Sequence, residues 1–341
     1  MVDGMSKVMV GLSGGVDSAV AAYLLKKQGY EVAGATFRLL DEWDEAKDAK
    51  AVADYLGIPH YVFDFREIFK KEVLDNFTEE YKLGRTPNPC VRCNKFIKFP
   101  AFYEKAKELG YDLISTGHYA RTDGVNIFRA KNLAKDQSYM MYNIEKDMIP
   151  HLRFPLAELS KDEIRAIAAE AGIPVAQKPD SQDICFIPDG DTQAYIERNI
   201  GEMPHGKFVD ENGKCLGEHK GICRYTIGQR KGLGLSLPAP LYVGKIDPEA
   251  NEVVLVENEA LFKKRLIVRD FHWINGAPDM PIAVTCKIRY AHNPAPALAS
   301  TYFYDDRALI LFNEPQRAVT AGQSAVIYDG EKLLGGGVIL G

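Results

Sequence analysis

The pattern of hydrophobic and polar positions divides the chain into a part with alternating strands and helices and a strand-rich part. Up to about residue 200, short apolar runs that are typical of buried strands alternate with stretches of helical periodicity. The predicted strands are 7–12, 31–37, 60–65 and 112–115, and the predicted helices are 19–28, 45–56, 67–82, 96–109 and 160–171. The last helix begins with a capping box formed by Ser160 and Glu163. This alternation predicts an α/β fold with a parallel sheet, whose ligands bind at the carboxyl ends of the strands.

From about residue 201 onward, helical periodicity gives way to short β-type runs that are broken by Gly, Pro, Asn and Asp. These runs are 208–209, 241–246, 252–256, 266–268, 282–290, 298–304, 308–312, 325–328 and 332–339. They predict small β units, and we place the boundary between two of them near residue 265. The expected division is therefore 1–200, 201–265 and 266–341.

A six-residue turn with the sequence Ser-Gly-Gly-Val-Asp-Ser, residues 13–18, joins the first predicted strand to the first predicted helix. Backbone N–H groups and the positive end of a helix dipole converge there, and the two glycines allow a ligand close to the backbone. Ser13 and Ser18 add hydroxyl donors, and Asp17 can help to hold Mg²⁺. The turn is neither a Walker A element nor a dinucleotide fingerprint. It favours a polyphosphate ligand over the alternative of a plain Gly-rich turn.

Composition is that of a globular enzyme. The chain has 341 residues, of which 46% are hydrophobic and 26% charged, so two or three domains are expected and disorder is not. There is neither a basic leader with an apolar core nor a run of 18 apolar residues. We therefore expect a cytoplasmic protein with no membrane association, and a monomer by default. Six cysteines in that compartment are expected to be unpaired, catalytic or metal-bound.

The formal net charge is −5, but acidic and basic residues are unevenly distributed along the chain. Three basic stretches, 81–103, 219–246 and 280–304, contain no acidic residue at all. Such stretches could follow a nucleic-acid backbone, or they could be ordinary solvated faces.

Cysteine spacing gives a second candidate site. Cys90 and Cys93 form a Cys-x-x-Cys pair in a segment with two prolines, which predicts a loop, and Cys185 lies in a separate segment. Arg92 and Lys95 would lower the pKa of Cys93 and make it a candidate nucleophile. A zinc site is a rival interpretation, but no second Cys-x-x-Cys or His pair completes a tetrahedron. The remaining three cysteines, Cys215, Cys223 and Cys286, are expected to pack in β structure.

The turn at residues 13–18 resembles the Ser-Gly-Gly-x-Asp-Ser loop of the PP-loop ATP pyrophosphatases, which split ATP into AMP and pyrophosphate. Over nearly its whole length, the chain resembles the family of bacterial tRNA-specific 2-thiouridylases. The segments that carry this resemblance are 11–18, 86–99, 116–121, 135–139, 181–186, 224–230, 287–290 and 319–324. The resemblance implies a PP-loop domain, a small central domain and a C-terminal β-barrel. It also implies ATP- and Mg²⁺-dependent replacement of the C2 oxygen of the tRNA wobble uridine by sulfur.

The resemblance also assigns roles to residues. Cys93 matches the nucleophile and Cys185 the cysteine that bears the persulfide; the sulfur comes from a cysteine desulfurase, a relay protein or sulfide. Positions that match the ATP site are Gly11, Leu12, Ser13, Gly14, Gly15, Val16, Asp17, Ser18, Phe37 and Gly117. Asn88, Pro89 and Cys90 match positions around the target base. Positions that match tRNA contacts are His118, Lys135, Asp136, Gln137, Arg289, Tyr290 and Gln323. From its residues alone, His118 is better explained as a satisfied histidine at a strand end.

Cys90 departs from the family pattern, in which many members carry an aspartate. Three thiolates, from Cys90, Cys93 and Cys185, would suffice for a [4Fe–4S] cluster with one open iron, so the cluster and the persulfide scheme both stay open. The segment 39–47 is shorter than in many relatives, so the residues that contact the adenine of ATP also stay undecided. Two other functions compete: a PP-loop synthetase for a small molecule, and a non-catalytic protein that binds tRNA and carries a metal or iron–sulfur group.

Overall fold

The computed structural model describes residues 6–41, 45–179, 184–301 and 306–340, which form two compact units. Unit 1 comprises Met1–Val73, Cys90–Phe186 and Glu331–Leu333, and unit 2 comprises Leu74–Pro89, Ile187–Gly330 and Leu334–Gly341. Two sequence predictions fall partly outside these ranges. They are residues 181–183 of the motif around Cys185 and residues 302–304 of the strand predicted at 298–304.

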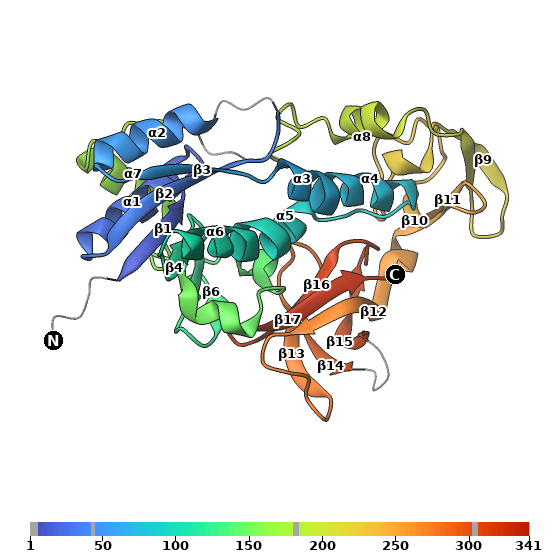
Figure 1. The fold of residues 1–341 in the computed structure, drawn as a ribbon. Helices are drawn as coiled ribbons and strands as arrows, with labels where there is room; N and C mark the ends of the chain where they lie inside the picture. Colours follow the sequence, from blue (N-terminus) through green and yellow to red (C-terminus); the bar gives the residue numbers. More distant parts are fainter. Residues whose placement is uncertain (1–5, 42–44, 180–183, 302–305, 341) are drawn as a thin grey trace. The chain divides into compact units, whose positions relative to one another are not determined.

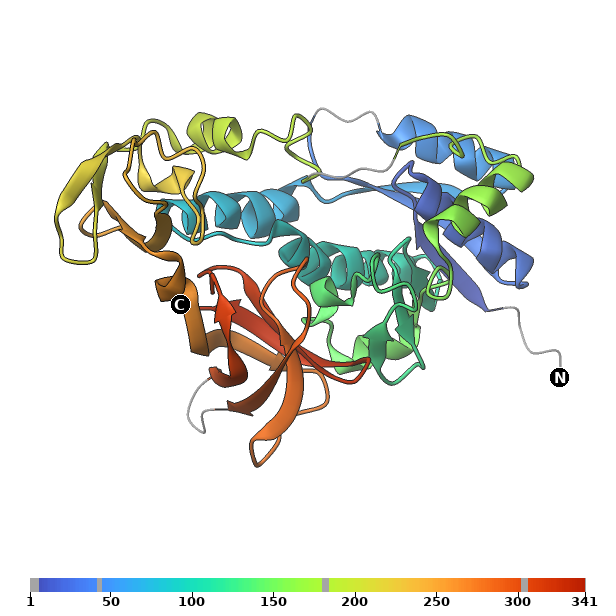
Figure 2. The ribbon, with the colours of Figure 1, turned by 180° about the vertical axis from the view of Figure 1, so that it is seen from behind.

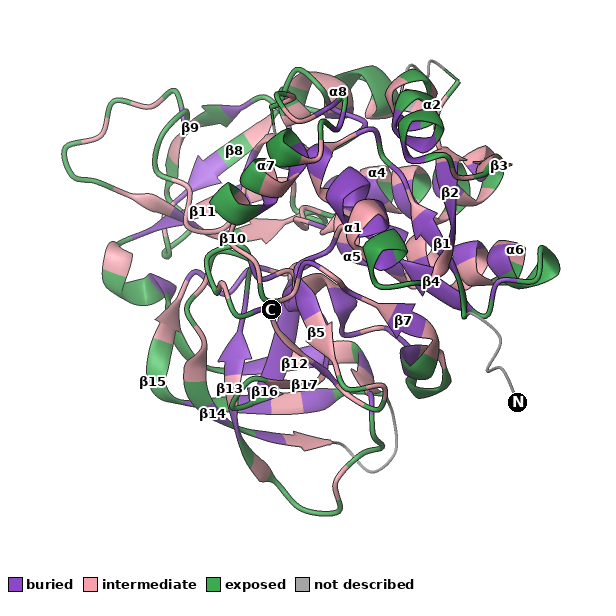
Figure 3. Ribbon diagram, turned by 90° about the vertical axis from the view of Figure 1, so that its left-hand side faces the viewer, coloured by how far each residue is buried: buried purple, intermediate pink, exposed green. Residues whose placement is uncertain are grey.

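Unit 1 contains the predicted parallel sheet, with its five strands in the order β3-β2-β1-β4-β7 (Figure 1). The strands are β1 (Lys7–Gly11), β2 (Glu31–Arg38), β3 (His60–Asp64), β4 (Leu113–Ser115) and β7 (Leu152–Arg153). The register brings Val8 opposite both Val32 and Leu113, so β1 lies in the middle of the sheet. The middle of β1 is fully buried, as expected for a parallel strand that is covered on both faces (Figure 3).

Helices cover both faces of this sheet, and the alternation of side chains along each strand explains which residues meet them. Val8, Val10 and Val32 share one apolar core with α1 (Val16–Lys27), α2 (Glu45–Leu56) and α7 (Lys161–Glu170). The opposite face presents Phe37, whose ring packs on Phe102 at the start of α6 (Phe102–Glu108), 4.8 Å between ring centroids. The capping box predicted at the start of α7 is confirmed.

Two helical stretches change their winding along their length. The first runs through α3 (Arg66–Phe69), the π-helix η1 (Lys70–Leu74) and α4 (Asp75–Lys82). The second runs through α5 (Pro89–Cys93), the π-helix η2 (Asn94–Ala101) and α6. The prediction of a loop around Cys90 and Cys93 is therefore wrong, whereas the helix predicted at 96–109 is confirmed and begins earlier, at Pro89. Pro89 occupies the first helical position, where its missing N–H costs nothing, and Pro100 cannot donate to the preceding turn, which favours the wider π winding.

A short hairpin follows β4 and was missed in the sequence because its strands, β5 (Ala120–Thr122) and β6 (Ile127–Arg129), are too short for a periodic signal. The Asp123 carboxylate closes its turn by accepting from the backbone N–H groups of Val125 and Asn126. Two 3₁₀ turns, η3 (Ser138–Met141) and η4 (Lys146–His151), lead from the hairpin towards β7.

Unit 2 is mostly β structure, as predicted. After α8 (Thr192–Ile200), which the sequence analysis missed, comes a four-stranded sheet in the order β10-β11-β8-β9. Its strands are β8 (Gly206–Val209), β9 (Cys215–His219), β10 (Tyr242–Asp247) and β11 (Glu252–Val256), with the 3₁₀ turns η5 (Ile222–Arg224) and η6 (Asn258–Leu261) beside them. Phe208, Tyr225 and Val243 belong to the core of this sheet.

A closed antiparallel barrel of six strands completes unit 2, and Figures 1 and 2 show it from opposite sides. Its strands are β12 (Phe262–Trp273), β13 (Ile282–Lys287), β14 (Ala295–Thr301), β15 (Ala308–Arg317), β16 (Ser324–Asp329) and β17 (Lys332–Ile339). The long β12 pairs with β15 through its first part and with β17 through its last part, which closes the barrel. The fold class predicted from the sequence is confirmed; the domain boundaries near 200 and 265 stay predictions.

The cysteines predicted to pack in β structure behave in two ways. Cys223 and Cys286 are buried, in agreement with the prediction. Cys215 is exposed, so the prediction is wrong for this residue. The reason is its place at the start of β9, the edge strand of the four-stranded sheet.

None of the described helices is long and apolar enough to cross a bilayer.

Candidate active site

The turn at residues 13–18 lies where an open parallel sheet offers its ligand crevice. The chain leaves β1 through α1 to β2 on one side, whereas β4 flanks β1 on the other side. The carboxyl ends of β1 and β4 therefore form a topological switch point, and the turn lies directly after β1. Gly14 has a positive φ of 70°, which favours glycine, and Gly15 is the N-cap of α1 without a capping side chain. This leaves the first turn of α1 suited to an anion.

Ser18 holds the shape of the turn from inside. Its buried hydroxyl accepts from the Ser13 N–H at 3.2 Å and donates to the Gly15 carbonyl at 3.1 Å. Its oxygen also lies 3.3 Å from the Ser13 hydroxyl, and Ser13 itself is exposed. The two serines thus have different roles: Ser18 stabilises the backbone of the turn, and Ser13 is exposed to solvent.

Asp17, in the first turn of α1, is fixed by two side chains that the sequence analysis missed. Its Oδ1 accepts from the Tyr119 hydroxyl at 2.9 Å and from the Lys161 ammonium at 2.7 Å. Tyr119 is buried, and the Lys161 side chain is only 14% exposed. The predicted capping box could have pointed to Lys161, because a Ser160 N-cap makes Lys161 the first residue of its helix.

Gly117 lies against the turn, and Phe37 lies at the end of β1; the ATP-site roles that the resemblance gives them stay predictions. A Cβ on Gly117 would lie 2.8 Å from the backbone nitrogen of Ser18, so only glycine fits this close against α1. The Phe37 ring packs against Phe65 and Phe102, and a Cβ on Gly11 would approach its edge to 3.3 Å. The ring therefore borders the end of β1.

Cys93 is a buried thiol on a helix and not the loop thiol that the sequence suggested. Burial raises the pKa of Cys93 to about 12, and the nearby thiols of Cys185 and Cys90 add to this shift while Lys98 opposes it. Cys90 is half-buried and Cys185 is exposed. The three cysteines assigned to the chemistry are therefore near enough to interact, but the expected lowering of the Cys93 pKa is wrong.

The two cations that were expected to activate Cys93 interact with other side chains. Arg92 pairs with the Glu72 carboxylate at 2.9 Å, and both Arg92 and Lys95 lie over the ring of Phe96. Lys98, and neither of these two residues, is the cation that lowers the pKa of Cys93 against the effect of burial. In an α-helix, a residue five positions on lies about 140° around the axis, whereas the i→i+5 winding of a π-helix brings it back towards the same face. The π-helix η2 thus explains why sequence spacing pointed to the wrong cation.

The cysteine side chains do not fit the [4Fe–4S] interpretation. Within the ranges that the structure describes, no three His, Cys, Asp or Glu side chains lie close enough together to hold a metal ion. The three cysteines as they lie do not form the three-thiolate set that such a cluster needs.

His118 is a buried, neutral histidine. Its Nδ1 lies 2.7 Å from the Thr116 hydroxyl, and its ring packs beside Phe99. Burial lowers the pKa of His118 to about 3, with a further contribution from Lys98. This favours the alternative interpretation, a histidine satisfied inside the protein; the tRNA contact stays a prediction without support from this geometry.

We expect His118 to make the protein sensitive to acid. With a folded-state pKa of about 3 and an unfolded value near 6.5, the unfolded chain binds the extra proton between these two values, so stability falls as pH falls. The contribution is about 1.4 kcal/mol per pH unit. In the H118Q variant, the free energy of unfolding from urea titrations between pH 4 and 6 should change less steeply by that amount. An unchanged slope would contradict the neutral, buried state.

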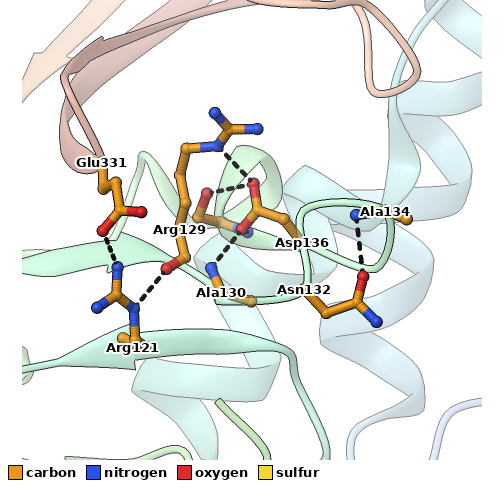
Figure 4. Close-up of polar contacts among 8 residues, drawn as sticks. Arg121, Arg129, Ala130, Asn132, Ala134, Asp136 and Glu331 are labelled. Carbon is orange, nitrogen blue, oxygen red and sulfur yellow. Dashed lines mark hydrogen bonds and ion pairs between the residues drawn. The ribbon is translucent and has the colours of Figure 1, made fainter. Parts of the chain in front are cut away.

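Of the three adjacent residues predicted to contact tRNA, the structure exposes one. Lys135 is exposed, whereas the Asp136 side chain is completely buried among backbone and side-chain donors (Figure 4). The Gln137 side chain accepts from the Tyr119 backbone N–H at 2.9 Å. The Asp136 carboxylate accepts four hydrogen bonds inside the protein, so this geometry gives no support to a tRNA contact through it, and the tRNA contact of Asp136 stays a prediction.

Unit 2 carries the remaining candidates. Gln323 donates to the Thr86 carbonyl at 2.8 Å, so it supports the segment that leads to the half-buried Asn88 and the buried Pro89. Arg289 and Tyr290 are both exposed at the end of β13. Their exposure suits a contact with a large partner, which stays a prediction.

The acid-free stretches of sequence are not acid-free in space. Lys82, Arg85 and Arg92 pair with Glu79, Glu80 and Glu72, which all precede the first stretch. Arg224 and Lys245 of the second stretch pair with Glu197 and Asp247. At these positions the geometry favours the alternative of ordinary solvated faces, because side chains from neighbouring elements supply the missing carboxylates. Arg230 and Lys231 remain exposed in the second stretch.

Comparison with known proteins agrees with this architecture. A family model described as the tRNA methyl transferase HUP domain matches residues 6–189. The tRNA methyl transferase PRC-barrel domain matches residues 193–257, and the aminomethyltransferase beta-barrel domain matches residues 263–339.

Full-length relatives are also similar. The chain is 46% identical over 353 residues to the tRNA-specific 2-thiouridylase MnmA of Clostridioides difficile strain 630, covering 98% of each chain. It is 46% identical over 361 residues to the protein of that name from Carboxydothermus hydrogenoformans, covering 99% of this chain and 98% of the relative. Identity to the Clostridium botulinum Eklund 17B protein is 47% over 352 residues, covering 98% and 97%. From its family-model matches and these relatives, the chain belongs to the tRNA-specific 2-thiouridylase MnmA family.

Proposed function

We propose that this protein is a tRNA-uridine 2-sulfurtransferase, which replaces the C2 oxygen of the wobble uridine with sulfur in a reaction that consumes ATP. The observation that carries the proposal is the placement of an intact Ser-Gly-Gly-Val-Asp-Ser turn at the switch point of unit 1, which also contains Cys93 and Cys185. Full-length relatives with the name tRNA-specific 2-thiouridylase support the same reaction.

ATP is needed because a uracil carbonyl oxygen is a poor leaving group. In the first step the C2 oxygen attacks the α-phosphorus of ATP, the bond to the β-phosphate oxygen breaks, and pyrophosphate leaves. The turn at residues 13–18 would hold that pyrophosphate through backbone N–H groups and the Ser13 hydroxyl. Asp17 is the residue that would hold Mg²⁺, whose chemistry is to neutralise phosphate charge.

Sulfur transfer uses the two cysteines. A desulfurase or relay protein transfers sulfane sulfur from its own cysteine persulfide to Cys185, and the donor's cysteine leaves as a thiol. Free sulfide, where it is the donor, bypasses the persulfide and supplies hydrosulfide directly. The Cys93 thiolate attacks the Cys185 sulfur, a Cys93–Cys185 disulfide forms, and the terminal sulfur leaves as hydrosulfide with the bonding electron pair. Hydrosulfide adds to C2, and AMP leaves with the original oxygen. An external dithiol then reduces the disulfide, which restores both thiols. We place this activity in the cytoplasm and in a monomer.

Mass spectrometry of tRNA incubated with the protein, Mg²⁺-ATP and sulfide tests the proposal. The expected products are AMP, pyrophosphate and a uridine that is 16 mass units heavier at the wobble position, by the replacement of one oxygen by one sulfur. A PP-loop synthetase for a small molecule would leave the tRNA unchanged, and a non-catalytic tRNA-binding protein would form no AMP. Absence of both AMP and thiolated tRNA would refute the proposal.

Lys161 should contribute to ATP binding. Its ammonium lies against Asp17 at the edge of the phosphate turn, so a bound polyphosphate would come within its reach. The K161A variant should raise the KM for ATP about 10- to 100-fold, because a hydrogen bond to a charged group contributes about 1.5–3 kcal/mol. K178A, which removes the exposed Lys178–Asp48 pair in the same unit, is the matched control and should leave this KM unchanged. Equal KM values in the two variants would exclude Lys161 from the site.

A further inference from the structure

The loop formed by residues 131–135 projects from unit 1 between β6 and η3. Lys131, Leu133 and Lys135 are all exposed on it, and Leu133 retains 52% of its surface. Inside the loop, the Asn132 side chain accepts from the Ala134 N–H at 3.2 Å (Figure 4). Lys131 has one ion pair, at 3.7 Å from Glu158, and both partners are largely exposed, so this pair contributes little.

Asp136 ties the two ends of this loop together. Its Oδ1 accepts from the backbone N–H of Ala130 at 3.0 Å and of Ser138 at 3.2 Å, one on each side of the loop. Its Oδ2 accepts from the Ser138 hydroxyl at 3.0 Å and from Arg129 Nε at 3.3 Å. Figure 4 shows the carboxylate between Arg129 and Ala130. Its side chain has no exposed surface, so the carboxylate faces the protein and not the solvent.

Two further contacts fix the base of the loop to the hairpin. The Gln137 backbone N–H donates to the Tyr119 carbonyl, and the Gln137 side chain accepts from the Tyr119 N–H, both at 2.9 Å. On the other side, the Arg129 carbonyl accepts from Arg121 Nε at 2.8 Å, and Arg121 also pairs with Glu331 (Figure 4). The loop therefore starts and ends on a framework that is held by buried or half-buried hydrogen bonds.

We propose that Asp136 is a positioning residue for tRNA: by clamping the 131–135 loop, it holds Lys131 and Lys135 in place to contact RNA phosphates. The proposal rests on the proposed function and changes the role of one residue within it. Two ammonium groups on an ordered loop bind a phosphate backbone better than the same groups on a loose one, because less conformational entropy is lost on binding.

The direction of the mutational effect separates a clamp from a simple charge. If Asp136 acted only through its negative charge, its removal would strengthen the binding of polyanionic tRNA. A clamp predicts the opposite: in D136A the Kd for tRNA rises about 10-fold, and the dependence of log Kd on log salt becomes shallower by about 1 for each lysine that no longer binds a phosphate. D136N keeps an acceptor oxygen for the two backbone N–H groups, so its Kd should stay within about threefold of wild type.

A double-mutant cycle shows whether Asp136 acts through the lysines. In a K131A/K135A background, the further change D136A should raise the Kd by less than about twofold, because the groups that it positions are gone. A full 10-fold effect in that background would overturn the proposal. S138A removes one of the four hydrogen-bond donors to the Asp136 carboxylate and replaces D136A as the test variant if D136A does not fold. The Kd of S138A for tRNA should rise by about threefold.

Asp123 offers a matched control, because its carboxylate closes the neighbouring hairpin turn but no lysine lies in that turn. Filter binding of tRNA to wild type, D123A, D136A and D136N should give a raised Kd in D136A alone. Thermal melting and the KM for ATP should show D136A folded, with an unaltered nucleotide site. An unchanged or lowered Kd in D136A, while the wild type still thiolates tRNA, would refute the clamp alone. Failure of the wild type to bind tRNA would refute the proposed function as well.

Discussion

The C93S variant should lose thiolation by more than about 10³-fold while it still forms the adenylated tRNA, because a serine hydroxyl at a buried position cannot replace a thiolate as nucleophile. Adenylation requires the phosphate turn and the target base, and neither is changed by this substitution. The measurement is thiolated uridine by mass spectrometry beside tRNA-dependent exchange of labelled pyrophosphate into ATP. Only the first of these two activities should fall.

Two comparisons make the Cys93 result specific. C215S, which changes an exposed cysteine of unit 2, should retain full activity. If Cys93 serves to release hydrosulfide from Cys185, millimolar free sulfide should restore part of the thiolation in C93S, whereas a persulfide donor should not. Thiolation by C93S within tenfold of wild type under persulfide conditions would remove Cys93 from the mechanism.

The second large effect is expected at Gly117. In G117A the added Cβ would lie 2.8 Å from the Ser18 nitrogen and 3.1 Å from the Asp17 carbonyl carbon, both backbone atoms of α1 that cannot rotate away. The start of α1 must shift, and with it the N–H groups that face the phosphates. We expect kcat/KM for ATP to fall by more than about 10²-fold, as displacements near 1 Å in a reacting site commonly produce.

Gly110 provides the control for this prediction. It has a positive φ of 81°, and a Cβ added there would have no atom within 4 Å, so G110A adds backbone strain of about 1 kcal/mol away from the site. G110A should lower the melting temperature and leave ATP kinetics unchanged. If G117A and G110A behave alike, the close approach of Gly117 to α1 does not shape the nucleotide site.

The sequence predicted the parts of the fold that repeat a simple period. The strands β1 to β3, the helix α2 and the capping box of α7 lie within one or two residues of their predicted positions. The predicted burial holds for β1 and β2 but is wrong for β3, which lies at the edge of the sheet and has no buried residue. These elements have long apolar patterns or an explicit capping signal, which local sequence is able to carry.

The sequence did not predict features that depend on winding or on distant partners. The sequence predicted a loop in which Arg92 and Lys95 flank the Cys93 thiol. The segment is helical instead, the π-helix η2 brings Lys98 near the thiol, and Glu72 pairs with Arg92. The role of Asp136 was equally hidden, because an acidic residue inside a basic motif looks exposed until its backbone donors are known.

The burial of Cys93 has a consequence for how the protein survives between catalytic cycles. With a pKa near 12, only about one molecule in 10⁵ carries the Cys93 thiolate at pH 7. Peroxide and other oxidants react with thiolates and hardly at all with thiols. The resting protein therefore stores its nucleophile in a form that oxidants attack slowly, and the same burial that delays the reaction protects the sulfur until a substrate arrives.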